Sequence, residues 1–265
     1  MLLAVEISNS VLNFGLFDTN RTDDMIKSFK IATDLNKTFD EYSVVISGIF
    51  QHYGIAKESV DGAIVCSVVP QLTDVIVSVI KSLCGVCAMT VGKGTRSGFP
   101  IRVDNPSELG TDLVSNAAAA INIMKKEENK LSPAIIVDLG TATTVFALNS
   151  KGEYIGGCIY PGIGISFEAL HGKTAQLPSV SPENPTRAIG KNSQESLRSG
   201  IILGNAIIVD GFIERFAREM NCGEDFKVFL TGEYAHMITA FLTHDFKHIP
   251  ELTLMGLLYL YKNNI

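Results

Sequence analysis

Two short polar turns carry the residues of this sequence that are best suited to bind phosphate. They are residues 6–10 (EISNS) and residues 138–141 (DLGT), and each adjoins an apolar segment that we expect to be a strand. Small turn residues let a ligand approach the backbone, whose N–H groups can bind phosphate oxygens. The carboxylate in each turn cannot bind phosphate directly, but it can bind Mg²⁺ or a monovalent cation that neutralises phosphate charge. The alternative is two ordinary hairpin turns with solvated acids.

The segments around the two turns match each other. At one constant offset, residues 2–10 align with residues 134–142 in hydrophobicity, and Glu6 falls on Asp138. The same offset also makes four further matches: Ser8 with Gly140, Asn9 with Thr141, Phe14 with Phe146 and Leu16 with Leu148. Because the offset is almost half of the chain, it indicates an internal duplication. We therefore expect two related lobes, residues 1–130 and 131–265, with a nucleoside triphosphate in the cleft between their facing turns; chance similarity of two apolar hairpins is the alternative.

Strand and helix patterns alternate along the chain, which is typical of the α/β class. Short apolar runs predict strands at residues 2–7, 11–17, 62–66, 134–137, 143–148, 154–160 and 228–230. Helical patterns cover residues 38–51, 72–83, 107–126, 165–171, 193–220, 234–242 and 252–261. These elements must position the two turns and the third candidate site described next.

The third candidate site lies at the start of the predicted helix 107–126. Gly110 falls within the first turns of that helix, where glycine costs roughly 1 kcal/mol relative to alanine, so we expect close approach by another group. Asp112 follows it and is suited to act as a general base. An ordinary acid that is favoured by the helix dipole is the alternative.

Composition and charge exclude several classes of function. The chain has 22 Lys+Arg and 28 Asp+Glu, so its formal charge is −6, which argues against broad electrostatic binding of nucleic acid or an anionic membrane. The N-terminus lacks the basic region and apolar run of a signal peptide. No window of 18 consecutive apolar residues predicts a membrane span. We expect a soluble cytoplasmic protein.

Other motifs have the wrong spacing or context for chemistry. Cys84 and Cys87 form a C-x-x-C, but the pair follows a helical pattern and has no second pair to complete a zinc site, so we interpret these thiols as structural. Residues 172–174 (GKT) resemble the end of a P-loop, but the required first glycine falls at Phe167. His244 and His248 are four residues apart without an evident third metal ligand.

Taken together, the motifs resemble those of the type III pantothenate kinases. The resemblance rests on residues 100–106 (PIRVDNP), 110–112 (GTD), 138–144 (DLGTATT), 156–157 (GG), 161–164 (PGIG), 173–178 (KTAQLP), 190–193 (GKNS), 231–232 (TG) and 252–257 (LTLMGL). It extends from residue 1 to about residue 262. That family has the fold of acetate and sugar kinases, Hsp70 and actin, with two ribonuclease-H-like lobes, which agrees with the internal repeat.

The resemblance implies an enzyme that uses ATP to phosphorylate the terminal hydroxyl of pantothenate, the first step of coenzyme A synthesis. It implies a homodimer that requires Mg²⁺ and K⁺ or NH₄⁺. It makes Asp112 the base that removes the hydroxyl proton and Asp138 the ligand of the monovalent cation. The ATP-binding residues that it implies are Glu6, Ile7, Ser8, Asn9, Ser10, Val11, Leu12, Asn13 and Thr141. The substrate-binding residues that it implies are Val103, Gly110, Thr111, Asp112, Leu113 and Ser193.

The chain departs from the family pattern at two places that matter for activity. The first phosphate loop of the family usually reads Asp-x-Gly-Asn-Thr, whereas here Glu6 adds a methylene and Ser8 adds a side chain. Leu113 replaces an arginine whose charge would bind the substrate carboxylate, and Val103 replaces a tyrosine. Among Arg96, Arg102 and Lys173, Arg102 is best placed to substitute for the missing arginine, although a solvated surface charge is the simpler interpretation of each.

Three functions therefore remain open. The first is a pantothenate kinase with a repacked pocket, and the second is a kinase for a related hydroxylated substrate that lacks the carboxylate. The third is a non-catalytic nucleotide-binding regulatory homologue. The presence of Asp112 and Asp138 favours catalysis. Only the first function predicts ADP release that depends on pantothenate.

Overall fold

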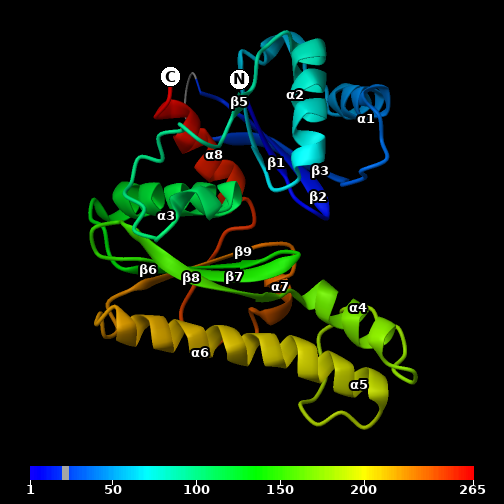
Figure 1. Cartoon of the computed structure of the whole chain (residues 1–265), viewed down its shortest axis with the longest axis vertical. Coiled ribbons are helices and arrows are strands. Elements are labelled where there is room, and N and C mark those ends of the chain that lie inside the picture. Colours follow the sequence, from blue (N-terminus) through cyan, green and yellow to red (C-terminus); the bar gives the residue numbers. More distant parts are fainter. Residues whose placement is uncertain (20–23) are drawn as a thin grey trace. The chain divides into compact units, whose positions relative to one another are not determined.

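The computed structural model describes residues 1–19 and 24–265, which form two compact units (Figure 1). Unit 1 comprises Met1–Gly98, Asn105–Asn122 and Leu252–Ile265, and unit 2 comprises Phe99–Asp104 and Ile123–Glu251. The expected lobes were 1–130 and 131–265, so the division differs most at the C-terminus. There, helix α8 (Leu252–Lys262) is almost entirely apolar and is buried against strands of unit 1.

Unit 1 is built on a five-stranded sheet with the order β3-β2-β1-β4-β5. Strand β1 (Leu2–Ile7) pairs antiparallel with β2 (Val11–Phe17), and β2 pairs antiparallel with β3 (Met25–Ala32). Strands β4 (Gly62–Ser67) and β5 (Met89–Thr90) extend the sheet in parallel with β1. The sequence analysis did not predict β3, because Lys27, Ser28 and Lys30 interrupt its apolar residues, as is common at the edge of a sheet.

Helices pack on both faces of this sheet. Helices α1 (Phe39–His52) and α2 (Pro70–Cys84) form the main core of unit 1 with one face, and α1 begins at a capping box of Thr38 and Glu41. Helix α8 packs on the opposite face and against α3 (Thr111–Glu128), whose last residues belong to unit 2. Two single turns, η1 (Lys57–Ser59) and η2 (Pro106–Glu108), complete the unit.

Unit 2 contains a second sheet with the corresponding order, β10-β9-β6-β7-β8. Its strands are β6 (Ala134–Leu139), β7 (Ala142–Leu148), β8 (Tyr154–Pro161), β9 (Lys227–Thr231) and β10 (Lys247–His248). Both sheets have a β-bulge at the same point of the second strand, between Leu16 and Phe17 in unit 1 and between Ala147 and Leu148 in unit 2. The shared order, pairing and bulge confirm an α/β fold with two ribonuclease-H-like lobes related by duplication.

The repeat differs from the sequence alignment by one residue after the turn. Three residues separate β1 from β2, whereas two residues separate β6 from β7. The expected matches of Phe14 with Phe146 and of Leu16 with Leu148 are therefore wrong. Strand pairing equates Phe14 with Val145, and it equates Leu16 with Ala147. The shorter turn in unit 2 accounts for the shift.

The helices of unit 2 are α4 (Ile163–Lys173), α5 (Ser193–Arg198), the π-helical segment η3 (Ser199–Leu203), α6 (Gly204–Glu219) and α7 (Ala235–Ile238). From α5 to α6 the backbone forms one helical stretch, Ser193–Glu219, and α6 lies along a face of the second sheet (Figure 1). This stretch has the length and hydropathy of a membrane span, and 39% of its most apolar window is buried. That is weak support for a membrane location, because core helices meet the same test.

Candidate active site

Four strands of unit 1 place one side chain each in a row across the sheet. Glu6 on β1 pairs with Cys66 on β4 and with Asn13 on β2, and Asn13 pairs with Lys30 on β3. Side chains that lie directly opposite each other in paired strands point to the same face. The row Cys66–Glu6–Asn13–Lys30 therefore lies on the α8 face, opposite the main core. Lys30 was not among the predicted site residues, since it belongs to the strand that the sequence pattern did not reveal.

The carboxylate of Glu6 is held by neighbours from three elements. The Nδ2 atom of Asn13 donates a hydrogen bond of 2.6 Å to Glu6 Oε2. Loss of water raises the pKa of Glu6, and the nearby charge of Asp112 raises it further. The hydrogen bond from Asn13, the charge of Lys30 and the hydroxyl of Thr253 on α8 lower the pKa of Glu6. Glu6 is thus a dehydrated but hydrogen-bonded acid beside a second acid.

That second acid, Asp112, lies in the first turn of α3. The N–H of Val114 donates to the carbonyl oxygen of Gly110 at 3.2 Å, so Gly110 precedes the helix and does not lie within it as expected. A Cβ atom on Gly110 would collide with Oδ1 of Asp112, which is the close group that the glycine accommodates. Burial raises the pKa of Asp112, although the backbone N–H groups of Leu113 and Asp112 lower it. A raised pKa makes a carboxylate a stronger base.

Contacts with β4 and α8 fix the position of α3. The hydroxyl of Thr111 donates to the carbonyl oxygen of Ser67 at 3.1 Å and accepts from its N–H at 3.2 Å. A Cβ atom on Gly256 of α8 would collide with the backbone of Ser115, so the two helices cross in close contact. Nearby, Thr253 Oγ1 donates to Asn116 Oδ1 at 2.9 Å within the core. These contacts hold Asp112 beside the row.

The charges of both acids affect the pKa of the Cys66 thiol. Cys66 is 1% exposed, and its pKa lies well above the ordinary value because of burial and the charges of Glu6 and Asp112. A hydrogen bond with Ser115 opposes this shift. The sequence analysis treated Cys66 only as one of five cysteines, all of which are free thiols in the structure. Cys66 therefore lies near Glu6, Asp112 and Ser115 within unit 1.

The turn between β1 and β2 is closed by its own serine. The N–H and the hydroxyl of Ser8 donate to the carbonyl oxygen of Val11 at 3.0 and 2.8 Å, and the N–H of Val11 is 3.3 Å from Ser8 Oγ. Asn9 and Ser10 are exposed at the tip. Ile7 and Leu12 are 1% and 0% exposed in the core. Of the predicted ATP-binding residues, these two can therefore contact a ligand only through backbone atoms.

Unit 2 presents a corresponding row with different chemistry. Asp138 on β6 pairs with Thr231 on β9 and with Thr144 on β7, and Thr144 pairs with Ile159 on β8. The buried Oγ1 of Thr144 has no hydrogen-bond partner among the described residues. Gly232, at φ +98°, makes room for the acid, because a Cβ atom there would lie 2.6 Å from Asp138 Oδ1. The row offers several oxygen atoms around a short carboxylate.

Two glycines near the turn of unit 2 differ in whether the packing of the protein requires them. A Cβ atom on Gly162 would collide with the carbonyl oxygen of Thr141 and lie 2.6 Å from that of Gly140, so packing requires glycine there. At Gly140, in contrast, the nearest atoms to a Cβ would be 3.6 Å away, and φ is not positive. The protein itself does not require glycine at position 140. The open space beside its backbone suits close approach by a ligand.

The remaining predicted substrate residues are divided between the units. Leu113 lies in unit 1 and is 8% exposed, so its side chain contributes mainly to packing. Val103 and Ser193 lie in unit 2, and Ser193 is the exposed first residue of α5. Arg102 forms an ion pair with Glu153 at 2.9 Å within unit 2. Its guanidinium is therefore already paired, which weakens its candidacy as the substitute for the missing arginine.

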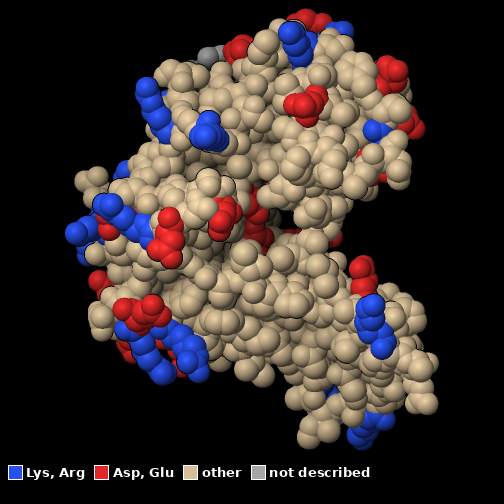
Figure 2. Space-filling view, in the orientation of Figure 1, with Lys and Arg blue, Asp and Glu red and all other residues tan. Residues whose placement is uncertain are grey.

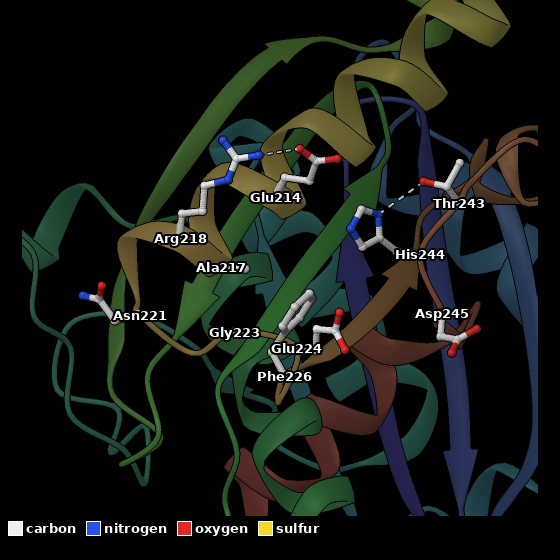
Figure 3. Close-up of a pocket in the computed structure, with 10 residues that line it drawn as sticks. All are labelled: Glu214, Ala217, Arg218, Asn221, Gly223, Glu224, Phe226, Thr243, His244 and Asp245. Atoms are coloured by element: carbon white, nitrogen blue, oxygen red, sulfur yellow. Dashed lines mark hydrogen bonds and ion pairs between the residues drawn. The ribbon is translucent and has the colours of Figure 1, made fainter.

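A groove of about 960 Å³ in unit 2 contains none of the predicted site residues (Figure 3). Glu214 and Arg218 form an ion pair of 3.0 Å on one wall. His244 lies on another wall, and its Nδ1 is 3.0 Å from Asp210 Oδ1. Within residues 1–19 and 24–265, no cluster of three or more His, Cys, Asp or Glu is arranged to hold a metal ion. His244 thus has a carboxylate partner rather than a set of metal ligands.

Charged side chains are dispersed on the face shown in Figure 2. Lys and Arg alternate there with Asp and Glu across a mainly uncharged surface, and neither sign forms a continuous band on that face. The formal charge of the chain is −6. A broad basic surface, which non-specific nucleic-acid binding uses, is therefore not a feature of this face.

Known sequences match the chain over its full length. A family model described as type III pantothenate kinase matches residues 2–215. The type III pantothenate kinase of Streptomyces coelicolor is 38% identical over 271 residues, which cover 100% of this chain and 99% of that protein. The type III pantothenate kinase of Persephonella marina is 40% identical over 266 residues, which cover 100% of both.

Solved structures share the fold at lower sequence identity. A Campylobacter jejuni protein described as a Baf family transcriptional activator has a TM-score of 0.59 at 16% identity and covers 98% of both chains. The inorganic polyphosphate/ATP-glucomannokinase of an Arthrobacter species has a TM-score of 0.51 at 11% identity and covers 99% of both chains. At these identities the likeness shows the fold alone. Because the sequence matches span the whole chain and the duplicated fold accompanies them, the chain belongs to the type III pantothenate kinase family.

Proposed function

We propose that the chain transfers the γ-phosphoryl group of ATP to pantothenate, giving 4′-phosphopantothenate and ADP. This makes it a phosphotransferase with an alcohol acceptor, at the first step of coenzyme A synthesis. Membership of the family supports the proposal. The structural observation that carries it is the half-buried Asp112, whose pKa is raised by loss of water at the start of α3, beside a second acid, Glu6. A dehydrated carboxylate of this kind suits general base catalysis.

In the proposed reaction, Asp112 removes the proton of the terminal hydroxyl as that oxygen attacks the γ-phosphorus. The bond from the γ-phosphorus to the bridging oxygen breaks, and ADP leaves with the electron pair. Gly110 leaves space for the carboxylate, and Thr111 anchors the helix that carries it. Phosphoryl transfer depends mainly on positioning and charge neutralisation, so a rigid base on an anchored helix is what the reaction needs. Val103, Leu113 and Ser193 remain proposed substrate contacts, each considered within its own unit.

The nucleotide contacts are proposed for both turns, each within its own unit. In unit 1, Glu6, Ser8, Asn9 and Ser10 contribute side chains, and residues 7, 11 and 12 contribute backbone atoms. In unit 2, Thr141 contacts a phosphate, and the open space at Gly140 supports that assignment. Each turn joins two antiparallel strands, and its backbone N–H groups and hydroxyls supply the donors.

The donor atoms also fit the cations that this chemistry uses. Around Glu6 the potential ligands are the oxygens of Glu6 and Thr253, which is the donor type that Mg²⁺ prefers. When bound, Mg²⁺ neutralises phosphate charge. Around Asp138 the buried, unpartnered Oγ1 of Thr144 adds an oxygen, which fits K⁺ or NH₄⁺. We assign Asp138 to the monovalent cation for this reason.

A homodimer in the cytoplasm completes the proposal. On α6, Ile207 is 71% exposed and Ile208 is 41% exposed. Gly204 and Gly211 on the same helix have no atom within 4 Å of a potential Cβ. Burial of this apolar surface of unit 2 against a second copy would stabilise the assembly. Sedimentation equilibrium tests it, and a monomer at micromolar concentration would contradict it.

The proposed activity is tested by mass spectrometry of 4′-phosphopantothenate. Purified protein is incubated with ATP, Mg²⁺ and pantothenate, in K⁺ or in Na⁺. Asp112→Asn is the inactive variant, and Asp74→Asn, at an exposed acid of the same unit, is the matched control. Product that requires K⁺, disappears in Asp112→Asn and persists in Asp74→Asn supports the proposal.

Two other outcomes would redirect the assignment. Leu113 is apolar and well packed, so it cannot bind the carboxylate of pantothenate. A substrate without the carboxylate is therefore assayed in parallel. Phosphorylation of pantothenyl alcohol but not of pantothenate would assign the related-substrate function. ATP binding by a folded protein without turnover of either compound would assign the non-catalytic regulatory function.

A further inference from the structure

The pairing of Glu6 with Asn13 has no counterpart in unit 2. At the equivalent position of the repeat, the acid is the shorter Asp138 and its cross-strand partner is Thr144. The Oγ1 of Thr144 makes no hydrogen bond within the described residues, whereas Asn13 Nδ2 reaches Glu6 Oε2 at 2.6 Å. The longer acid of unit 1 thus coincides with a partner that can hold it.

We infer that Asn13 is a positioning residue that fixes the carboxylate of Glu6 beside Asp112, and that it acts on the reaction through Glu6. This role differs from the direct ATP contact that the family resemblance implies for Asn13. The inference rests on the proposed function, because its kinetic consequence requires turnover. It concerns one hydrogen bond between two residues whose backbones are already paired in the sheet.

The backbone geometry makes Asn13 suitable for this task. It lies inside β2, and pairing with β1 on one side and β3 on the other fixes its backbone. Its side chain has fewer rotatable bonds than that of Glu6, so it can restrict the more flexible partner. Lys30 is directly opposite on the other neighbouring strand, and its charge also favours the ionised form of Glu6. Both neighbours on β2 and β3 therefore favour one charged, oriented carboxylate.

The unfavourable features of Asn13 argue against a merely structural role. Asparagine is disfavoured in strands. In addition, its Oδ1 is buried and has no hydrogen-bond partner among the described residues. A β-branched residue would avoid both problems. Among residues 1–19 and 24–265, the contact of the amide that offsets them is the hydrogen bond to Glu6. Displacement of a catalytic group by about 1 Å can lower the rate about 100-fold, so this contact matters if Glu6 takes part in the reaction.

A double-mutant cycle tests the inference. The four proteins are the wild type, Asn13→Thr, Glu6→Asp and the double variant, which has the pairing of residue types seen in unit 2. We expect Asn13→Thr to lower kcat by about tenfold or more with KM for pantothenate changed less than twofold. The kcat of the double variant should be about tenfold higher than the value expected if the two single losses multiplied. The reason is that the shorter acid does not form the hydrogen bond with the Asn13 amide, so loss of that amide costs less.

A matched control and a second measurement separate positioning from stability. Asn122→Ala removes an asparagine of unit 1 whose amide donates to the carbonyl oxygen of Ala118 at 2.8 Å, within its own helix, and it should leave kcat unchanged. Urea unfolding of the four nucleotide-free proteins should show coupling between positions 6 and 13. A shifted urea midpoint with unchanged kcat, or an equal loss of kcat in the Glu6 and Glu6→Asp backgrounds, would overturn the inference.

Failure of the proposed function would be distinguishable. If the wild type does not turn over pantothenate, the proposed activity is refuted, and the same cycle is measured by calorimetry as the Kd for ATP with Mg²⁺. Non-additive changes in Kd of about tenfold would then support the positioning of Glu6 by Asn13. Additive changes would overturn it.

Discussion

The two rows of cross-strand side chains share a backbone plan but differ in chemistry. In unit 1 the row is Cys66, Glu6, Asn13 and Lys30, and in unit 2 it is Thr231, Asp138, Thr144 and Ile159. Strand order, pairing and bulge position are the same in both. The first row combines a long acid with an amide and an ammonium group, whereas the second places hydroxyls around a short acid. A duplicated backbone thus determines where the side chains lie, and residue type gives each row its own set of polar groups.

The turns beside the rows differ in the same manner. In unit 1, Ser8 closes its turn with hydrogen bonds to Val11. In unit 2, Gly140 leaves open space, while Gly162 packs against the turn from behind. The first turn is thus held by hydrogen bonds between its own residues, whereas the second turn is held by packing against Gly162. We therefore expect substitution of Gly162 mainly to lower stability and substitution of Gly140 mainly to weaken ligand binding.

The largest expected effect concerns Asp112, the acid that lies beside the row of unit 1. Asp112→Asn should lower kcat by about 10²–10⁴-fold, because the base is removed while its hydrogen-bonding shape remains. Stopped assays of ADP release measure this, and circular dichroism verifies folding. Retention of more than a tenth of the activity would show that the base lies elsewhere and that the row of unit 1 is not the catalytic one.

A pair of glycine variants tests the support of the turn in unit 2. Gly162→Ala should lower the free energy of unfolding by roughly 1–3 kcal/mol, because its Cβ would collide with the turn. Gly140→Ala should change that free energy by less than about 0.5 kcal/mol, because its Cβ would have only ordinary contacts, yet it should raise KM for ATP. Urea unfolding and initial rates check both. Equal destabilisation by the two variants would contradict the distinction between a packing glycine and a ligand-facing glycine.

The pH dependence of stability should reveal the dehydrated acids of unit 1. The folded-state pKa of Glu6 is raised above its ordinary value of 4.5, so the folded protein retains this proton more strongly than the unfolded chain. Its contribution to stability is then largest below about pH 4.5 and is lost as pH rises through the folded pKa. Glu6→Gln should therefore raise the free energy of unfolding on the order of 1 kcal/mol at pH 8 and much less at pH 4.

The measurement is urea unfolding of wild type and Glu6→Gln at the two pH values. Glu41→Gln serves as a contrasting variant, because hydrogen bonds from Thr38 lower the pKa of Glu41. Its loss should weaken the protein at pH 8 instead. A gain for Glu6→Gln that is the same at pH 4 and pH 8 would show that Glu6 is not the dehydrated group.

The smallest expected effect concerns the ion pair of Arg102 with Glu153. Arg102 is 64% exposed at its side chain, so the pair should contribute at most about 0.5 kcal/mol to stability. Arg102→Ala should leave KM for pantothenate within twofold, because the guanidinium is engaged with Glu153. A tenfold rise in that KM would show that Arg102 contacts the substrate.

Much of the fold was predictable because local patterns were strong. The strands on both sides of each turn are mainly apolar, and a single acid near the end of β1 and of β6 interrupts each apolar run. β3 escaped prediction because an edge strand alternates too weakly. The helix expected at residues 234–242 is confined to Ala235–Ile238, since local pattern does not determine where a helix ends. The sequence contains one sign of the pairing of Asn13 with Glu6: an asparagine inside a predicted strand, where asparagine is disfavoured.

The sequence by itself determined the two turns, the acids at positions 6, 112 and 138, and the repeat that relates the halves, because each depends on residues that are close in the chain. Only the tertiary structure decided that Asp112 and Glu6 form one site. Their proximity requires Gly256 of α8 to cross Ser115 of α3, and it requires strand register to align Glu6 with Asn13. These contacts join residues far apart in sequence, so their energies arise only when the whole unit packs, and no local pattern encodes them.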